Sequence, residues 1–374
     1  MAKQYAFSWW LVGIVTSFLA GSAAGPLAAA EPEYQSKPLS KWIEDFESGE
    51  PRRRIEAEKA FKALGPEAAP ALPNLVRALR NNRGPDPGVF VRIGAAAVPH
   101  LVPLLDDERT RHKTLAYAAL RGMNADAVPA IVEALRTSPP ARQLLLINIL
   151  RDQEEKAKAS VPALKEFLKH RSETHQLESA RALVRIDPSA NPDAIPVLEK
   201  FFRAGTSSQK NDVVWAYGSV VWKGIDHGVW GPHNEPAVQG IVKSLKTEGP
   251  ERSAALSAVS NFHSVVFSKD FRTGPEAPPP ATPVPIERLR KEFFEGTVTC
   301  LDSKDPQIVA EAIGRLGGFR ELAEPMVPRL QEIMKQRPGF TSAILKAYKG
   351  LGPHAKAAEP DVQKLLNHED TAIR

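Results

Sequence analysis

The chain has 374 residues, of which 43% are apolar, and its 49 basic and 44 acidic side chains give a formal net charge of +5. The regular recurrence of the apolar residues excludes a wholly disordered chain. The basic residues form no run longer than Arg52-Arg53-Arg54, so we expect no nucleic-acid partner. The single cysteine, Cys300, excludes an intramolecular disulfide and a CxxC metal motif, and we expect it to be a small buried apolar side chain.

Residues 1–30 have the composition of an export signal. No charged residue lies between Lys3 and Glu31, and the apolar run 9–20 has the length of a signal-peptide core. A membrane-spanning helix needs about 20 strongly apolar residues, more than this run provides. The segment ends in Ala28-Ala29-Ala30, and small residues suit signal peptidase. We expect cleavage after Ala30 and a periplasmic or extracellular mature protein without stable membrane insertion; retention as an uncleaved anchor is the alternative.

After a linker over 31–37, the sequence repeats pairs of helices over 38–374, and the second helix of a pair opens with a proline. Proline is tolerated in the first turn of a helix, where its missing N–H has no intrahelical partner. Apolar residues just before the proline and two, five and six positions after it form one helical stripe. We expect the prolines to occupy equivalent sites, with the residue before and the residue two after buried. They recur at intervals of 26 to 34 residues in the first part of the chain, at Pro73, Pro99, Pro129, Pro162 and Pro196, and again at Pro328 and Pro360.

The first helix of each pair carries small residues at helical spacing, which let two helix backbones approach closely. They include Ala57, Ala60 and Ala63, then Ala116, Ala118 and Ala119, and then Ala180 and Ala182. A single pair cannot bury both of its faces, so the pairs must stack. The sequence therefore predicts an all-α fold, a right-handed α-solenoid of about nine stacked antiparallel helix pairs, with no β-sheet beyond isolated turns.

Two places in this array are irregular. Residues 81–88 are rich in Gly, Pro and Asn, so the first helix of the second pair is predicted to be short or missing. Residues 368–374 resemble the start of a further first helix, and we expect the apolar side chains before them, Val362, Leu365 and Leu366, to be partly uncovered.

The openings of the first helices carry a recognisable pattern: an acidic or proline cap, then arginine, then spaced alanines. It occurs at Glu50-Pro51-Arg52, which leads to Ala57 and Ala60, and at Pro250-Glu251-Arg252, which leads to Ala255. These motifs resemble the HEAT-repeat family, in particular the short subgroup related to phycobilin lyases, in a bacterial exported form. The resemblance implies a HEAT-like superhelix and says little about function, because one scaffold carries many functions.

Two neighbouring stretches, the insertions at 222–235 and 267–285, break the repeat. The second has six prolines in eleven residues, which favour polyproline II. Both lie between the first and second helix of a pair, so we expect them side by side on one edge. They are either structural plugs or, with exposed aromatic residues, a binding site. The candidate binding residues of the region are Trp215, Trp222, Trp230, His227, His233 and Phe271.

No catalytic motif accompanies these residues. The chain has no GxSxG, P-loop or HExxH sequence. We therefore assign no catalytic residue, no metal ligand and no cofactor, and expect an exported, non-catalytic scaffold that binds proteins or peptides. The alternative is an exported hydrolase or metal-dependent enzyme that uses the aromatic and histidine segment 215–235, where Asp226, His227 and His233 are the conceivable metal ligands.

Overall fold

The computed structural model describes residues 31–187, 191–228, 230–266 and 283–366. The signal peptide expected at 1–30, the candidate Phe271 and the expected helix start at 368–374 lie outside the described residues.

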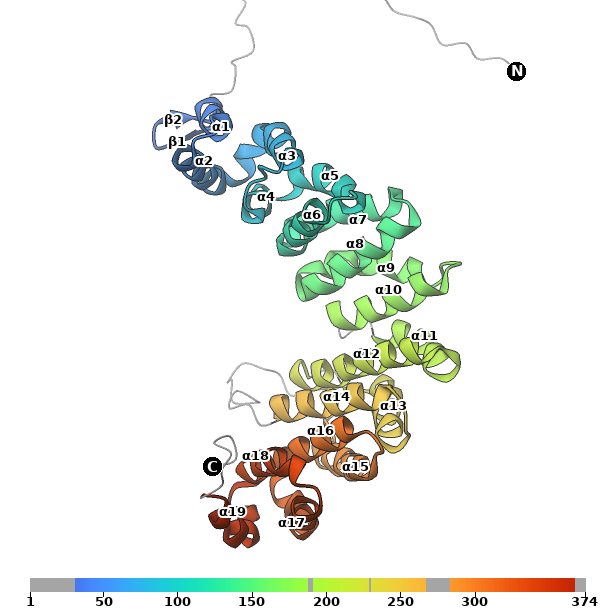
Figure 1. Ribbon diagram of the computed structural model, residues 1–374. Coiled ribbons are helices and arrows are strands. Elements are labelled where there is room, and N and C mark those ends of the chain that lie inside the picture. Colours follow the sequence, from blue (N-terminus) through green and yellow to red (C-terminus); the bar gives the residue numbers. More distant parts are fainter. Residues whose placement is uncertain (1–30, 188–190, 229, 267–282, 367–374) are drawn as a thin grey trace, which may run out of the picture.

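Within the described residues, nine helix pairs stack along an arc, as the sequence predicted for an all-α solenoid (Figure 1). The first helices of the pairs are α2 (Pro51–Leu64), α4 (Pro87–Ile93), α6 (Thr110–Gly122), α8 (Pro140–Gln153), α10 (Glu173–Ile186), α12 (Ser207–Asp226), α14 (Glu251–Val266), α16 (Pro306–Leu316) and α18 (Thr341–Leu351). The second helices are α3 (Leu72–Arg80), α5 (Val98–Leu101), α7 (Val128–Thr137), α9 (Val161–Phe167), α11 (Asn191–Ala204), α13 (Glu235–Lys246), α15 (Ile286–Thr299), α17 (Val327–Gln336) and α19 (Glu359–Leu365).

Short 3-10 helices make most of the remaining turns. Those inside the pairs are η1 (Gly65–Ala71), η2 (Gly94–Ala97), η4 (Ala125–Ala127), η5 (Glu154–Ser160), η7 (Pro232–Asn234), η9 (Gly317–Met326) and η11 (Gly352–Ala358). Those between pairs are η3 (Val102–Asp106), η8 (Cys300–Asp302) and η10 (Pro338–Phe340).

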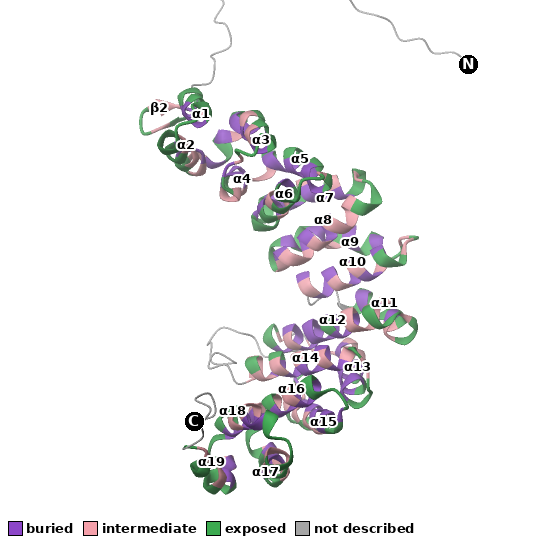
Figure 2. Cartoon of the chain, in the orientation of Figure 1, coloured by how far each residue is buried: buried purple, intermediate pink, exposed green. Residues whose placement is uncertain are grey.

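The first helices line the inner side of the arc and the second helices its outer side (Figure 1). Each first helix contacts the next along the whole array, from α2 to α18. Buried residues lie on the helix faces turned toward neighbouring helices, and exposed residues lie on the outside (Figure 2). The core is therefore one continuous layer between stacked pairs rather than a central cluster, as expected for a solenoid.

The expected small residues supply part of this layer. Ala57, Ala60, Ala116 and Ala119 are fully buried, and so are Ala180 and Ala182. Two members of the predicted set, Ala63 and Ala118, are instead exposed. Cys300 is buried, as expected, and its Sγ lies 3.3 Å from the Leu245 carbonyl oxygen.

The first-turn position expected of the prolines is wrong only at Pro196, and the expected burial is incomplete at Pro162, where Val161 is half-buried. Pro73, Pro99, Pro129, Pro162 and Pro328 lie in the first turn of a second helix. Pro196 instead lies inside α11, because that helix begins at Asn191 and Pro192 takes the early position. The residues flanking Pro196 keep the expected burial, since Ile195 and Leu198 are buried.

Pro360 lies in the first turn of α19, but the burial expected around it is wrong. Glu359 before it is exposed, and Val362 two residues after it is only half-buried. Leu365 is also half-buried and Leu366 is 60% exposed. The prediction that Val362, Leu365 and Leu366 are partly uncovered is therefore confirmed.

The N-terminal end carries a single tight turn closed by two short strands, within the expectation of no β-sheet beyond isolated turns. Strands β1 (Glu33–Tyr34) and β2 (Lys37–Pro38) form a two-residue antiparallel hairpin ahead of helix α1 (Leu39–Glu47). Gln35 and Ser36 between them have positive φ angles of 52° and 59°, as a tight hairpin turn of the I′ type requires. The Trp42 indole donates a hydrogen bond to the Tyr34 carbonyl oxygen at 3.2 Å and fixes the hairpin on α1.

The second pair is short, as its Gly- and Pro-rich entry predicted, since α4 has seven residues and α5 has four. By length and composition alone, the helical stretch Pro87–Asp106 could cross a membrane, but 50% of it is buried between neighbouring repeats. Its apolar composition therefore serves the solenoid core.

Glycine is needed where α18 meets the end of α16. A methyl group at Gly317 would lie 2.9 Å from the Ala347 carbonyl oxygen, and one at Gly350 would lie 2.9 Å from the Gly317 Cα. Both contacts are with backbone, which cannot move aside as a flexible side chain can. Gly314, one turn earlier on α16, has nothing within 4 Å of the same position.

We expect Gly317→Ala to lower the free energy of unfolding by about 1–3 kcal/mol, because the added methyl forces α18 away from α16. The matched control Gly314→Ala should raise it by about 0.5–1 kcal/mol, because alanine loses less backbone entropy in a helix. Urea unfolding followed by circular dichroism measures both. Equal effects of the two substitutions would contradict the close helix approach.

Candidate functional site

The candidate aromatic residues differ in exposure. Trp215 lies in the middle of α12 and is 45% exposed. Trp222 lies two turns further along the same helix and is half-buried. Trp230 is also half-buried and packs against the hydrophobic core. A surface anchor must offer free apolar area, so Trp215 is the best suited of the three.

The segment expected to be irregular from residue 222 is helical as far as Asp226, where α12 ends. The short η7 follows after the turn. Asn234 pins this turn to α12: its side chain donates to the Val220 carbonyl oxygen at 3.2 Å and accepts from the Gly231 N–H at 2.9 Å. Most of the second segment lies outside the described residues, so the expected contact of the two segments stays a prediction.

Trp215 forms a wall of a hollow on the inner side of the arc, with a volume of about 310 Å³. We call this the Trp215 hollow. Its lining comes from four consecutive first helices, α8, α10, α12 and α14: Arg151, Asp152, Arg181, Arg185, Trp215, Ala216, Ser219 and Asn261. Residues far apart in the sequence thus meet because first helices stack side by side.

Ion pairs between helices hold two of its arginines. Glu178 accepts from Arg151 at 3.1 Å and from Arg181 at 2.6 Å, and so joins α8 to α10. Arg181 also reaches Asp212 on α12, with an Nη2–Oδ1 distance of 3.1 Å. The Glu178 side chain is only 13% exposed, so these contacts are partly shielded from water and fix the guanidinium groups in place.

Arg185, the third arginine, donates from Nε and Nη2 to one oxygen of Glu154, at 3.1 and 2.6 Å. The other Glu154 oxygen lies 3.5 Å from the Nζ of Lys223, an ammonium group that is almost completely buried. Lys223 belongs to α12 and Glu154 begins η5, so this contact bridges two repeats.

Asp152 is the one acidic residue among those that line the hollow. It accepts a hydrogen bond from the Tyr117 hydroxyl at 2.9 Å, besides its contact with Arg151 at 3.3 Å. Burial, and then the hydrogen bond to Asp152, raises the pKa of Tyr117 to about 12. Tyr117 therefore stays a neutral donor, and Asp152 is engaged by the protein itself.

The histidines of the region lie apart from the hollow lining. His227 Nε2 lies 3.0 Å from Glu155 and 3.9 Å from Asp226. His233 is half-buried next to Gly231, and burial lowers its pKa. Within the described residues, no group of three or more His, Cys, Asp and Glu side chains is arranged to hold a metal ion.

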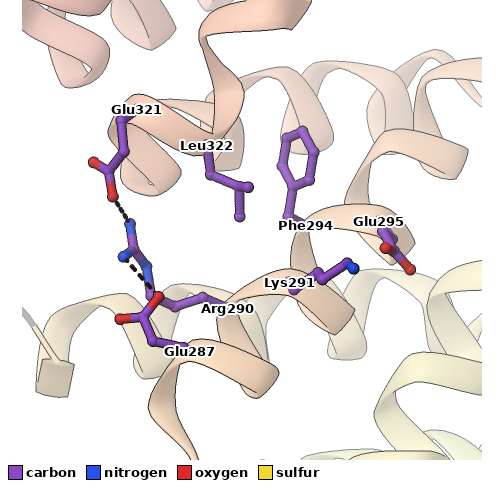
Figure 3. A pocket seen from close by; sticks show the side chains of 7 residues that line it. All are labelled: Glu287, Arg290, Lys291, Phe294, Glu295, Glu321 and Leu322. Carbon is purple, nitrogen blue, oxygen red and sulfur yellow. Dashed lines mark hydrogen bonds and ion pairs between the residues drawn. The ribbon is translucent and has the colours of Figure 1, made fainter.

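A second hollow, of about 530 Å³, lies between α15 and η9 (Figure 3). Phe294 and Leu322 form its apolar part, and Arg290 at its rim bonds Glu321 at 2.6 Å and Glu287 at 3.4 Å. The other charged residues of the rim, Lys291 and Glu295, are of opposite sign. The lining thus carries three acidic and two basic side chains, and Arg290 is engaged by two of the acidic ones.

The arginines of the Trp215 hollow are the residues that the sequence analysis missed. A signal for two of them was present, because every first helix except α14 carries a lysine or arginine in its last turn. Positive charge there compensates the helix dipole. Arg151 and Arg185 are the members of this series that line the hollow.

The arrangement of the pairs is similar to that of solved HEAT-repeat structures. Kap121p aligns with 90% of this chain at 12% identity and a TM-score of 0.58. Yeast importin-beta (Kap95p) aligns with 90% at 11% identity and a TM-score of 0.52, and Kap95p studied with RanGDP aligns with 90% at 13% and 0.53. The chain covers 40%, 50% and 48% of these proteins, respectively. At this identity the similarity shows the fold alone, a HEAT-like solenoid. No protein-family model and no curated protein sequence matches the chain.

We expect Glu178→Gln to lower the free energy of unfolding by about 2 kcal/mol, because two guanidinium groups lose their charge-assisted acceptor. The control is Glu166→Gln, which removes an exposed carboxylate 3.5 Å from Arg136; its cost should stay below about 0.5 kcal/mol. Thermal and urea unfolding of both variants give the comparison. A Glu178 variant as stable as the control would show that the ion pairs do not hold the hollow together.

Proposed function

We propose that the protein is a non-catalytic scaffold that binds a segment of another protein on the inner side of its solenoid, at the Trp215 hollow. The observation that carries this proposal is the 45% exposed indole of Trp215, set on a regular helix in a hollow. Aromatic and arginine side chains in such settings supply most of the binding energy in protein interfaces. Kap95p, a solenoid of similar fold, binds a protein partner, RanGDP.

The chemistry of the hollow favours binding over catalysis. Its carboxylate, Asp152, is engaged by Tyr117 and Arg151. Glu178 behind it is engaged by two arginines. A general acid or base must be able to exchange its proton with a substrate, whereas these groups are held as hydrogen-bond acceptors.

We further propose that the protein belongs to the short HEAT subgroup related to phycobilin lyases and is exported. The support is the charge-free apolar run 9–20 and the Ala28-Ala29-Ala30 exit, together with the cap–Arg–Ala pattern of the first helices. N-terminal sequencing of the protein from its native source should find a mature start near Glu31. A start at Met1 or Ala2 would contradict cleavage.

Binding at the hollow predicts that Trp215→Ala lowers capture of a partner from the native extract at least about tenfold, because an anchoring tryptophan contributes about 2 kcal/mol or more. The side chain is exposed, so the variant should unfold at the same temperature as the wild type. The bait is the purified mature chain, and quantitative mass spectrometry measures the captured protein.

The matched control is Ile55→Ala, which removes an apolar side chain 54% exposed on α2, far from the hollow. Capture by this variant should equal that of the wild type. Undiminished capture by the Trp215 variant would place the binding surface elsewhere on the chain.

A further inference from the structure

The Trp215 hollow, as the proposed binding site, also has a chemical preference. Three of its lining residues are arginines, Arg151, Arg181 and Arg185, and one is an aspartate. Of the four carboxylates that pair with the arginines, Glu154, Glu178 and Asp212 are not part of the lining, whereas Asp152 lies in it, 3.3 Å from Arg151. The lining therefore presents more guanidinium groups than carboxylates to an incoming molecule.

From this lining we infer that the bound partner segment is an acidic, extended peptide strand, whose carboxylates contact the arginines and whose apolar side chain packs on Trp215. The inference rests on the proposed function. A guanidinium group has five N–H donors in a planar fork and binds carboxylates in a bidentate manner. Arg185 uses only its Nε and Nη2 donors on Glu154 in the hydrogen bonds of the described residues, and its side chain is 41% exposed.

The spacing of the helices sets the spacing of the acidic residues. Arg151 lies on α8 and Arg185 on α10, and axes of packed helices are about 8–10 Å apart. An extended chain advances about 3.3 Å per residue. A strand that crosses the first helices thus brings every third residue to a new helix. We expect two acidic residues about three positions apart, followed by an apolar residue that reaches Trp215.

Short-range contacts rather than a long-range field favour this ligand. The acidic partners around the hollow offset the charge of the arginines, so attraction at a distance is weak. Asn261 on α14 adds an amide that can pair with the peptide backbone of a bound strand. A basic segment would instead place its ammonium groups next to three guanidinium groups of the same charge. Only its backbone carbonyl oxygens could accept hydrogen bonds from the arginines.

The experiment is the selection of a displayed library of random twelve-residue peptides on the purified mature chain. Enriched peptides should carry paired Asp or Glu residues about three positions apart with a neighbouring apolar residue, and Trp215→Ala should abolish the enrichment. Each enriched peptide is then synthesised with its acidic residues and with Gln or Asn in their place. The amide version should bind about 10- to 100-fold more weakly, because a hydrogen bond to a charged group contributes that much to the binding constant.

Two matched variants assign the effect to the hollow. Arg185→Gln should weaken the acidic peptide about tenfold or more and leave the amide peptide unchanged. Arg203→Gln removes an arginine that is 74% exposed on the outer helix α11 and should change neither. Arg185 is preferred to Arg181 for this test because its partner Glu154 is 39% exposed, whereas Glu178, a partner of Arg181, is only 13% exposed.

The outcomes separate the two proposals. Trp215-dependent enrichment of neutral or basic peptides would overturn the acidic ligand and keep the binding site. Enrichment that Trp215→Ala does not change, or no enrichment of any peptide, would overturn both. Equal loss with the Arg185 and Arg203 variants would overturn the role of the hollow arginines.

Discussion

The close approach of consecutive first helices is the constraint on which the rest of the structure depends. Each helix pair has two faces to bury, and only the neighbouring pairs can cover them. The helices meet through small residues: a methyl group at Gly218 on α12 would lie 3.2 Å from the Ala258 Cβ on α14. Because the first helices lie this close, the side chains on their inner faces lie next to those of neighbouring helices.

The ion pairs of the Trp215 hollow follow from this arrangement. The first helices α8, α10 and α12 end with the basic residues Arg151, Arg185 and Lys223, which compensate their dipoles, and stacking brings these ends into a row. Repulsion along the row is reduced where an acidic residue lies between two basic ones, as Glu154 does between Arg185 and Lys223. Replacing a partly buried ion pair by apolar residues changes stability little, since desolvation offsets the attraction, whereas removing one partner leaves the other charge unpaired and costs more. The larger effect of the ion pairs is geometric, because they fix the guanidinium groups before any partner arrives.

The sequence predicted the fold well and the site only in part. The Pro-led second helices and the spaced alanines depend on local geometry that recurs in each repeat. The pattern therefore occurs many times in one chain and can be recognised from the sequence. Pro196 does not lie in the first turn of α11 because that helix begins earlier, at Asn191, with Pro192 near its start. The repeated motif alone does not show which of the two prolines begins the helix. Trp215 was among the candidates, but aromatic composition could not separate it from the half-buried Trp222 on the same helix. The arginines were not predicted because no local sequence motif contains both Arg151 and Arg185. They come close together only because α8 contacts α10 in the fold.

The length of α12 explains why the hollow forms at this point of the array. This helix has 20 residues, whereas α10 before it has 14, so its end projects beyond its neighbour. The projection carries Lys223 and His227 to Glu154 and Glu155 of η5, one repeat further back. Elsewhere in a solenoid each repeat is tied only to the next, and small rotations accumulate along the stack. Here α12 is tied to two preceding repeats, so Trp215 keeps its position relative to Arg151 as well as Arg185. The proposed binding surface, made from four separate helices, then needs little reordering on binding, and the free energy otherwise lost to ordering is available for affinity.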